Sequence, residues 1–385
     1  MIEKNALSAM LDETIVLIQK FVQAESISPC DGRLHEIIAD YLSQLGFEIE
    51  HMNIEDTKNI YAHTPSNSSG PYTCFAGHTD VVPTGEGWKH PPYSGAIENG
   101  YIFGRGTNDM KGTIACAMVV FKYLLQKNPN LNLAMLLTSD EEAIAEHGLK
   151  KITPILINRN EPINLFVLGE PTALQTAGDT VKIGRRGSIS AIAKIFGIQG
   201  HIAYPELAKN PIPIALNIAK ELDEIDFADD HKYFGKTRLQ LTQIDAFNKA
   251  MNVIPGIVEL RFGTRFNTNQ NEDSIKNHII PIFEKYCKKH DVAYEIVWSF
   301  NGSPFICENE KLIASLDSII SPILGKQVLF DAKGATSDGR FLSKLAQCIE
   351  IGFQEDMAHK VDECIKIDEI KQILQIYSEI FAKNW

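Results

Sequence analysis

A histidine and an aspartate stand two residues apart where an apolar run ends, and together they could support metal-dependent chemistry. The run from Tyr72 to Ala76 has the length of a strand, and His78 and Asp80 follow it. Residues i and i+2 of an extended strand share a face, so Asp80 could accept a hydrogen bond from one ring nitrogen of His78 while the other nitrogen binds a metal. A strand end with two solvated polar residues is the alternative, and the tetrapeptide alone does not decide between them.

Further acidic groups follow two other apolar runs or precede a predicted helix. Asp140–Glu142 follow the run 133–138, Glu170 follows the run 165–169, and Asp109 stands in a glycine-containing turn. The strand ends of an open parallel sheet emerge along one edge, so these groups could meet in space. Each group alone also has an ordinary explanation as a helix cap, a charged first turn or a loop.

These groups, together with His359, could form a shell of two imidazoles and three carboxylates around a metal. Such a shell contains no thiolate, suits borderline to hard divalent ions, and can hold two of them if one carboxylate bridges. Glu141 and Glu142 are adjacent in the sequence. One of them could therefore coordinate a metal while the other stays free as a general base.

The elements that must position these residues follow two different patterns. In the first part of the chain, apolar runs of strand length alternate with helical patterns, which predicts an α/β domain with a mostly parallel sheet. From about Ser188 the order becomes β-α-β-β-α-β, which is that of a ferredoxin-like α+β unit. We therefore predict a catalytic domain formed by residues 1–186 and 303–385, with a second domain inserted at residues 187–302.

Composition argues against several classes of partner and compartment. The chain has 385 residues and a formal net charge of -12, which disfavours nucleic acid and anionic membrane surfaces as partners. Its seven cysteines are scattered and never spaced as Cys-x-x-Cys, which fits a reducing cytoplasm. The first residues lack a signal-peptide pattern, and no segment has the apolar length of a membrane span. A soluble cytoplasmic protein is expected.

Eight motifs extend over nearly the whole chain, and few of them are specific alone. They are GHTDVVP, GRGTNDMKG, SDEE, GEPT, GRRGS, GHIAYPELAKNP, NVIPG and GATSDGRF. In their order and spacing, the chain resembles the di-zinc aminoacylase/carboxypeptidase superfamily. The resemblance implies a zinc-peptidase-like catalytic domain, an inserted ferredoxin-like dimerisation or lid domain, and a homodimer formed through that inserted domain.

Carried over to this sequence, the resemblance also implies two zinc ions per subunit, which cobalt can replace. One zinc would be held by His78, Asp109 and Glu170, and the other by Asp109, Glu142 and His359, with Asp109 as the bridge. Asp80 would fix the ring of His78 from behind, and Glu141 would be the general base.

The same resemblance implies a pocket for an anionic substrate. The residues that would line it are Arg185, Tyr204, Asn252, Arg265 and Thr336. His201 would be lent to the partner's active site, where it would help to polarise the scissile carbonyl. A guanidinium can bind a carboxylate bidentately, as a succinyl group requires. A solvated place on the polar face of its strand is the alternative for Arg265.

The reaction that the resemblance implies is hydrolysis of N-succinyl-LL-2,6-diaminopimelate to succinate and LL-2,6-diaminopimelate, a step in lysine and diaminopimelate biosynthesis. Glu355 and Ala335 depart from the family pattern, and Glu355 leaves the substrate open because a carboxylate near the pocket repels an anion unless a cation neutralises it. A related deacylase, such as acetylornithine deacetylase or a small carboxypeptidase, is the second hypothesis. A non-catalytic metal-binding dimer is the third, and a free Glu141 speaks against it.

Overall fold

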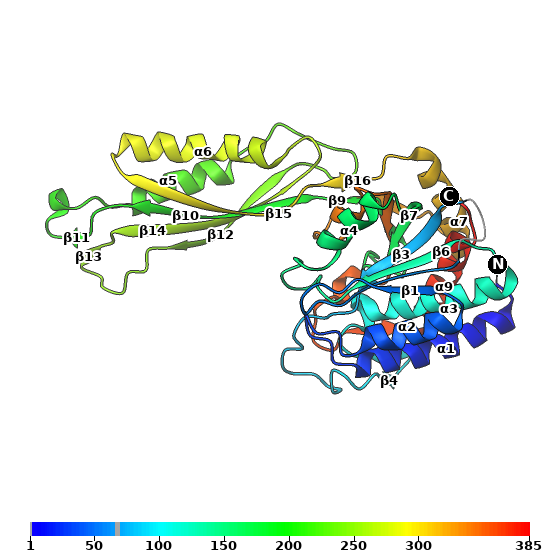
Figure 1. The fold of residues 1–385 in the computed structure, drawn as a ribbon. Coiled ribbons are helices and arrows are strands. Elements are labelled where there is room, and N and C mark those ends of the chain that lie inside the picture. Colours follow the sequence, from blue (N-terminus) through cyan, green and yellow to red (C-terminus); the bar gives the residue numbers. More distant parts are fainter. Residues whose placement is uncertain (1, 66–69) are drawn as a thin grey trace. The chain divides into compact units, whose positions relative to one another are not determined.

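The computed structural model describes residues 2–65 and 70–385. The chain divides into two compact units, which differ in architecture (Figure 1). The first comprises Met1–Gly184, Ile306–Asp331 and Ser337–Trp385, and the second comprises Arg185–Phe305 and Ala332–Thr336. The predicted boundaries lie within a few residues of these limits, except that the short segment Ala332–Thr336 returns to the second unit.

An eight-stranded mixed sheet forms the centre of the first unit, in the order β1-β2-β6-β3-β7-β18-β8-β17. Its strands are β1 (Glu48–His51), β2 (Asn59–His63), β3 (Tyr72–His78), β6 (Leu133–Thr138), β7 (Ile163–Leu168), β8 (Thr180–Lys182), β17 (Leu329–Asp331) and β18 (Gln347–Glu350). The neighbours β6, β3, β7 and β18 run parallel. Their carboxyl ends therefore meet along one edge, where open α/β sheets place ligands.

Helices pack around this sheet. They are α1 (Lys4–Gln23), α2 (Leu34–Gln44), α3 (Gly112–Lys127), α4 (Leu149–Asn158), α7 (Glu310–Leu324), α8 (Gly339–Leu342) and α9 (Ile367–Phe381). Aromatic rings join the layers: Phe75 of β3 lies 5.9 Å from Tyr377 of α9, and Phe121 of α3 lies 5.0 Å from Phe381, between ring centroids. Among the described helices, none combines the length and the apolar character that a bilayer crossing requires.

Short strands and helical turns lie in the connections between the longer elements of both units. The strands β4 (Ala96–Glu98), β5 (Tyr101–Phe103) and β19 (Cys364–Lys366) form a three-stranded sheet. The turns are η1 (Thr107–Lys111), η2 (Pro205–Leu207) and η3 (Glu355–Met357). The chain passes from one unit to the other at β9 (Gly184–Arg185) and β16 (Phe305–Ile306).

The second unit is an antiparallel sheet with two helices on one face. Its elements are β10 (Gly187–Phe196), α5 (Ile212–Asp223), β12 (Arg238–Asp245), β14 (Ile257–Phe266), α6 (Glu272–Lys289) and β15 (Ala293–Gly302). The strand order β12-β14-β10-β15 confirms the predicted ferredoxin-like topology. A separate two-stranded antiparallel sheet is formed by β11 (Gly200–His201) and β13 (Val253–Ile254).

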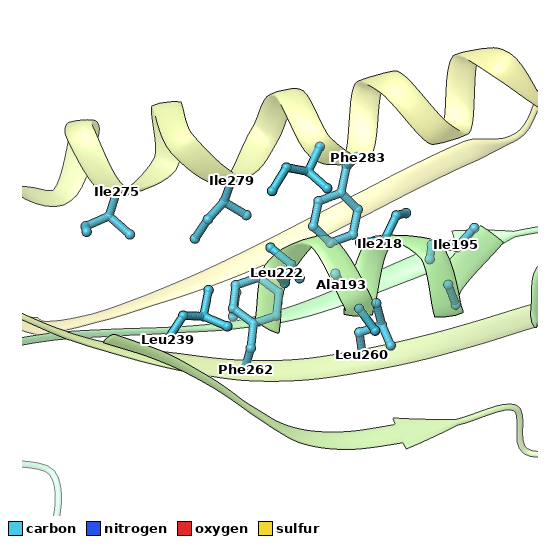
Figure 2. Close-up of a cluster of buried hydrophobic side chains, with 14 of the residues drawn as sticks. Ala193, Ile195, Ile218, Leu222, Leu239, Leu260, Phe262, Ile275, Ile279 and Phe283 are labelled. Carbon is cyan, nitrogen blue, oxygen red and sulfur yellow. The ribbon is translucent and has the colours of Figure 1, made fainter. Parts of the chain in front are cut away.

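The core of the second unit lies between the sheet and its helices, as Figure 2 shows. Alternate residues of β10, such as Ala193 and Ile195, face this core, and Ile279 and Phe283 of α6 close it from the other side. A fully buried side chain of this kind contributes roughly 1.5–3 kcal/mol. The intervening residues of each strand must therefore face the opposite, helix-free side of the sheet.

Candidate metal centre

Two groups of potential metal ligands share one aspartate in the first unit. They are His78, Asp109 and Glu170, and Asp109, Glu142 and His359; within each group the ligand atoms lie within 4.8 Å of one another. Asp109 directs Oδ1 to Nε2 of His78 at 3.1 Å and Oδ2 to Nε2 of His359 at 3.5 Å. Its two oxygens therefore face the two groups separately, as a bridging carboxylate must.

Strand ends position these side chains. His78 ends β3, Glu142 lies in the loop after β6, and Glu170 follows β7. Asp109 belongs to η1, which lies close against the strand ends. The approach is so close that a Cβ on Gly77 would overlap the side chain of Met110. Glycine at this place lets another part of the chain lie directly on the sheet.

Asp80 supports the centre through atoms other than those predicted. Nδ1 of His78 donates to the main-chain carbonyl of Asp80 at 2.9 Å, while the nearer carboxylate oxygen of Asp80 is 3.7 Å away. This bond fixes a proton on Nδ1 and leaves Nε2 to face Asp109. The Asp80 carboxylate instead accepts the backbone N–H groups of Glu141 at 3.2 Å and Glu142 at 3.1 Å. Asp80 thus aims the loop that carries both glutamates.

The acidic triplet does not begin a helix, since α4 starts only at Leu149. Asp140 closes the loop locally, because its carboxylate accepts the backbone N–H groups of Ala145, Glu146 and His147 at 2.8–3.1 Å. Glu142 pairs with His359, with 3.0 Å between Oε2 and Nε2. Glu141 belongs to neither ligand group.

Burial and charge shift the proton affinities of these groups. Burial opposes a charge on the ring of His78, but Asp109, Glu170 and Glu142 together outweigh that effect and raise the pKa. Hydrogen bonds to Asp109 and Glu142 raise the pKa of His359 to about 10. Burial, followed by the charge of Glu170, raises the pKa of Glu141 well above its usual value. The carboxylates therefore hold protons on both imidazoles when no metal is bound.

We expect zinc binding to the metal-free protein to release protons at pH 7. The pKa of His359 is raised from 6.5 to about 10, so a proton must leave Nε2 before that atom can coordinate. Zinc affinity should consequently rise with pH between these two values. Calorimetric titrations in two buffers of different ionisation enthalpy measure the released protons. An observed binding enthalpy that does not depend on the buffer would contradict the expectation.

The sequence is similar to a known protein family and to several named relatives. The model of peptidase family M20/M25/M40 matches residues 74–383. The chain belongs to this family. The succinyl-diaminopimelate desuccinylase of Hydrogenovibrio crunogenus is 41% identical over 374 residues, which are 95% of this chain and 97% of that relative. The succinyl-diaminopimelate desuccinylase of Pseudoalteromonas translucida is 37% identical over 376 residues, or 96% and 98% of the two chains.

Solved structures show the same fold at lower identity. Aminopeptidase PepT from Bacillus cereus is 16% identical, with a TM-score of 0.78 over 97% of this chain and 99% of that chain. An M20 metallo-carboxypeptidase from Sulfolobus solfataricus is 18% identical, with a TM-score of 0.75 over 96% and 99%. The protein is therefore an M20-family hydrolase with the two-unit architecture of that family.

A buried ion pair that the motifs did not reveal supports the Asp109 loop of this M20 enzyme. The carboxylate of Glu363 accepts the backbone N–H groups of Gly106 at 3.0 Å, Asn108 at 2.9 Å and Asp109 at 3.1 Å. It also accepts Nη1 of Arg105 at 2.8 Å. Burial raises the pKa of Glu363, while the Gly106 N–H and Arg105 act in the opposite direction.

Arg105 connects the same pair to two other loops. Its guanidinium donates to the main-chain carbonyls of Lys360 at 3.1 Å and Thr84 at 3.1 Å. Lys360 follows the ligand His359, and Thr84 lies in the loop after Asp80. The Arg105–Glu363 pair therefore ties together three loops that lead to the metal centre. No sequence motif could have indicated this, because the pairing partners are 258 residues apart.

Glu355, which departs from the family pattern, has a buried cation beside it. Nζ of Lys182 lies 2.9 Å from Asp331 and 3.4 Å from Glu355, and the lysine side chain is only 2% exposed. Lys182 and Asp331 are register partners in β8 and β17. The negative charge of Glu355 is thus partly neutralised within the first unit, which is the condition under which it does not repel an anion.

We expect Lys182→Met to lower the free energy of unfolding by about 3–5 kcal/mol, because it leaves the carboxylates of Asp331 and Glu355 without their buried cation. Urea denaturation measures the loss. Lys360→Met is the matched control: its ion pair with Asp356 is exposed on both sides and should contribute no more than about 1 kcal/mol. Equal losses in the two variants would show that the buried cation of Lys182 has no larger effect on stability than an exposed one.

All six predicted substrate residues lie in the second unit, where they form separate groups. His201, Tyr204 and Asn252 lie at or near the paired strands β11 and β13, where the Ile202 N–H donates to the Asn252 carbonyl at 3.1 Å. Arg265 stands opposite Ser188 at the far end of β10, and its Nη1 donates to the Ser188 hydroxyl at 2.6 Å. The remaining two are Arg185, beside Gly334, and Thr336 of the returning segment.

Proposed function

We propose that this M20 enzyme is a succinyl-diaminopimelate desuccinylase, which hydrolyses N-succinyl-LL-2,6-diaminopimelate to succinate and LL-2,6-diaminopimelate. The observation that carries the proposal is the full-length similarity, at 36–41% identity, to six relatives of that name. The ligand geometry supports the reaction class. The cysteines of the chain are free, which favours a reducing compartment, so we also propose that the protein is cytoplasmic.

We propose two zinc ions as the resident metals, with cobalt as a substitute. The chemistry of the donors supports this choice, because each group offers one imidazole nitrogen and two carboxylates. The ligands would be His78, Asp109 and Glu170 for one ion, and Asp109, Glu142 and His359 for the other. The nearby Asp80 would keep the ring of His78 in place through its main-chain carbonyl.

In this mechanism Glu141 moves the proton that amide hydrolysis requires. Zinc held by these ligands would lower the pKa of a bound water to about 7 and would polarise the scissile carbonyl. A carboxylate oxygen of Glu141 takes the proton of the attacking water and then gives it to the departing amide nitrogen.

We propose that Arg185 and Arg265 bind the anionic ends of the substrate, with Thr336 beside them. The hydrogen bond from Arg265 to Ser188 leaves the other N–H groups of the guanidinium available for a carboxylate. Glu355 need not repel an anionic substrate, since Lys182 neutralises part of its negative charge. Ala335 lies in the same short segment as Thr336, and nothing in the structure explains its departure from glycine.

We propose that a second copy of the chain completes the site through the second unit. His201 lies beyond the end of β10 that is opposite to Arg265. β10 has 10 residues, so the two side chains of one chain are roughly 30 Å apart. A small substrate cannot contact both, so if both contact one substrate, His201 with Tyr204 and Asn252 must come from the partner subunit.

We expect kcat/KM for N-succinyl-LL-2,6-diaminopimelate to exceed that for N-acetylornithine by at least about 100-fold. An acetyl group carries no distal carboxylate for the arginines, and a site built to pair a polar group rejects a substrate that lacks it. Steady-state kinetics of the zinc-loaded enzyme with both substrates test the proposal. A preference for the acetyl substrate would replace it with the acetylornithine deacetylase alternative.

A further inference from the structure

The helix-free face of the sheet in the second unit is hollowed into a groove that concentrates positive charge. The groove has a volume of about 760 Å³, and its lining includes Arg186, Arg238, Arg261 and Arg265. None of the described residues that line it is acidic. Four guanidinium groups around one hollow are unusual in a chain with a formal net charge of -12. They indicate an anionic occupant.

The strand register brings the arginines together on one face. Arg238 of β12 is the direct cross-strand partner of Arg265 of β14, so both side chains project from the same side of the sheet. Arg261 stands four residues before Arg265 on the same strand and shares that side. Like charges at directly opposite positions are destabilising. An arrangement that costs stability is expected where a ligand offsets the cost.

Small residues form the floor between these charges. Gly263 and Ser190 are register partners at the centre of the groove, and a Cβ on Gly263 would have only the Ser190 hydroxyl near it, at 3.3 Å. Ile192 and Val297 add an apolar wall further along. The hollow therefore has room for a compact ligand that is anionic at one end and has some apolar surface.

The contacts of the arginines leave donors for that ligand. Nε of Arg261 donates to the carboxylate of Glu259 at 2.7 Å, an ion pair that neutralises part of the Arg261 charge. Nη1 of Arg265 donates to the Ser188 hydroxyl at 2.6 Å and to the Thr264 carbonyl at 3.5 Å. Both guanidinium groups keep further N–H donors. Arg238 makes no side-chain hydrogen bond or ion pair with any described residue. Its exposed guanidinium keeps its planar fork, which matches carboxylate and phosphate oxygens.

We propose that this groove is a second anion-binding site, which takes a compact oxyanion of the carboxylate or phosphate class through Arg238 and Arg261. Arg265 stands at one end of it, so the site adjoins the proposed substrate arginines but extends well beyond them. The proposal does not depend on the proposed reaction, because it concerns binding alone. Guanidinium groups bind succinate and inorganic phosphate by the same chemistry.

Calorimetric titration of the full-length, zinc-loaded protein with succinate and with inorganic phosphate tests the proposal. We expect saturable binding of at least one anion, and the stronger of the two identifies the class. Arg238→Gln should weaken that binding at least about tenfold, which is about 1.4 kcal/mol. Lys288→Gln, which removes one exposed charge from α6 on the covered side of the sheet, should leave it unchanged.

Arg261→Gln provides an independent second variant and should weaken binding in the same direction. An unchanged unfolding temperature shows that each variant is folded. Absence of saturable binding for both anions would overturn the proposal. So would binding that Arg238→Gln and Arg261→Gln leave at full strength, since that result would place the anion at the metal centre or at Arg185 and Arg265.

Discussion

Glu141→Ala is expected to lower kcat by about 10²–10⁴-fold while the protein keeps its capacity to bind metal. The loss follows from the position of Glu141: it lies next to the ligand Glu142, yet it belongs to neither ligand group. Its backbone N–H is fixed by the Asp80 carboxylate at 3.2 Å, so the loop should keep its course when the side chain is shortened. The variant therefore removes a proton carrier and leaves the ligands in place.

Two measurements separate this result from loss of the site. Metal content by atomic emission should equal that of the unchanged protein, and KM should change much less than kcat, because Glu141 does not bind the substrate in the proposed mechanism. Glu146→Gln is the control, since it removes a carboxylate of the same loop that pairs only with lysines. Full activity in Glu141→Ala would show that Glu141 is not the proton carrier and that the proposed mechanism is wrong.

The strand patterns predicted that His78, Glu142 and Glu170 could lie close together, because strand ends obey a simple rule. His78, Glu142 and Glu170 each follow a buried strand, and parallel strands bring such ends to one edge whatever their separation along the chain. The ferredoxin-like unit was equally predictable, because its alternating strands and amphipathic helices leave few other packings. Both predictions rest on local patterns that determine a face or an end.

The supporting contacts could not be predicted, since they depend on the course of the main chain. The pattern of His78 and Asp80 predicted that the Asp80 carboxylate contacts the ring, but the ring bonds the main-chain carbonyl of Asp80 and the carboxylate accepts the N–H groups of Glu141 and Glu142 instead. Lys182 could not be connected with Glu355, 173 residues later, until β8 and η3 were placed in space. Hydrogen bonds to main-chain N–H and carbonyl groups cannot be predicted from residue types.

Glu363→Gln should weaken zinc binding by about 10–100-fold and lower the free energy of unfolding by about 3–5 kcal/mol. Glu363 accepts three backbone N–H groups of the loop that carries Asp109 and the guanidinium of Arg105. The glutamine amide has one oxygen that accepts hydrogen bonds. Its NH2 group would face N–H groups that need an acceptor. The buried charge of Arg105, with its guanidinium 3% exposed, would then lose its partner.

The decisive comparison is between zinc affinity and stability, because a purely structural residue would affect only the second. Competition with a chelator measures zinc affinity, and urea denaturation of the metal-free protein measures stability. Glu98→Gln is the matched control, since its pair with His90 is exposed and should change neither quantity appreciably. If Glu363→Gln lost stability but kept full zinc affinity, the loop would hold Asp109 in place without Glu363. A joint loss would show that the bridging ligand depends on a carboxylate that touches no metal.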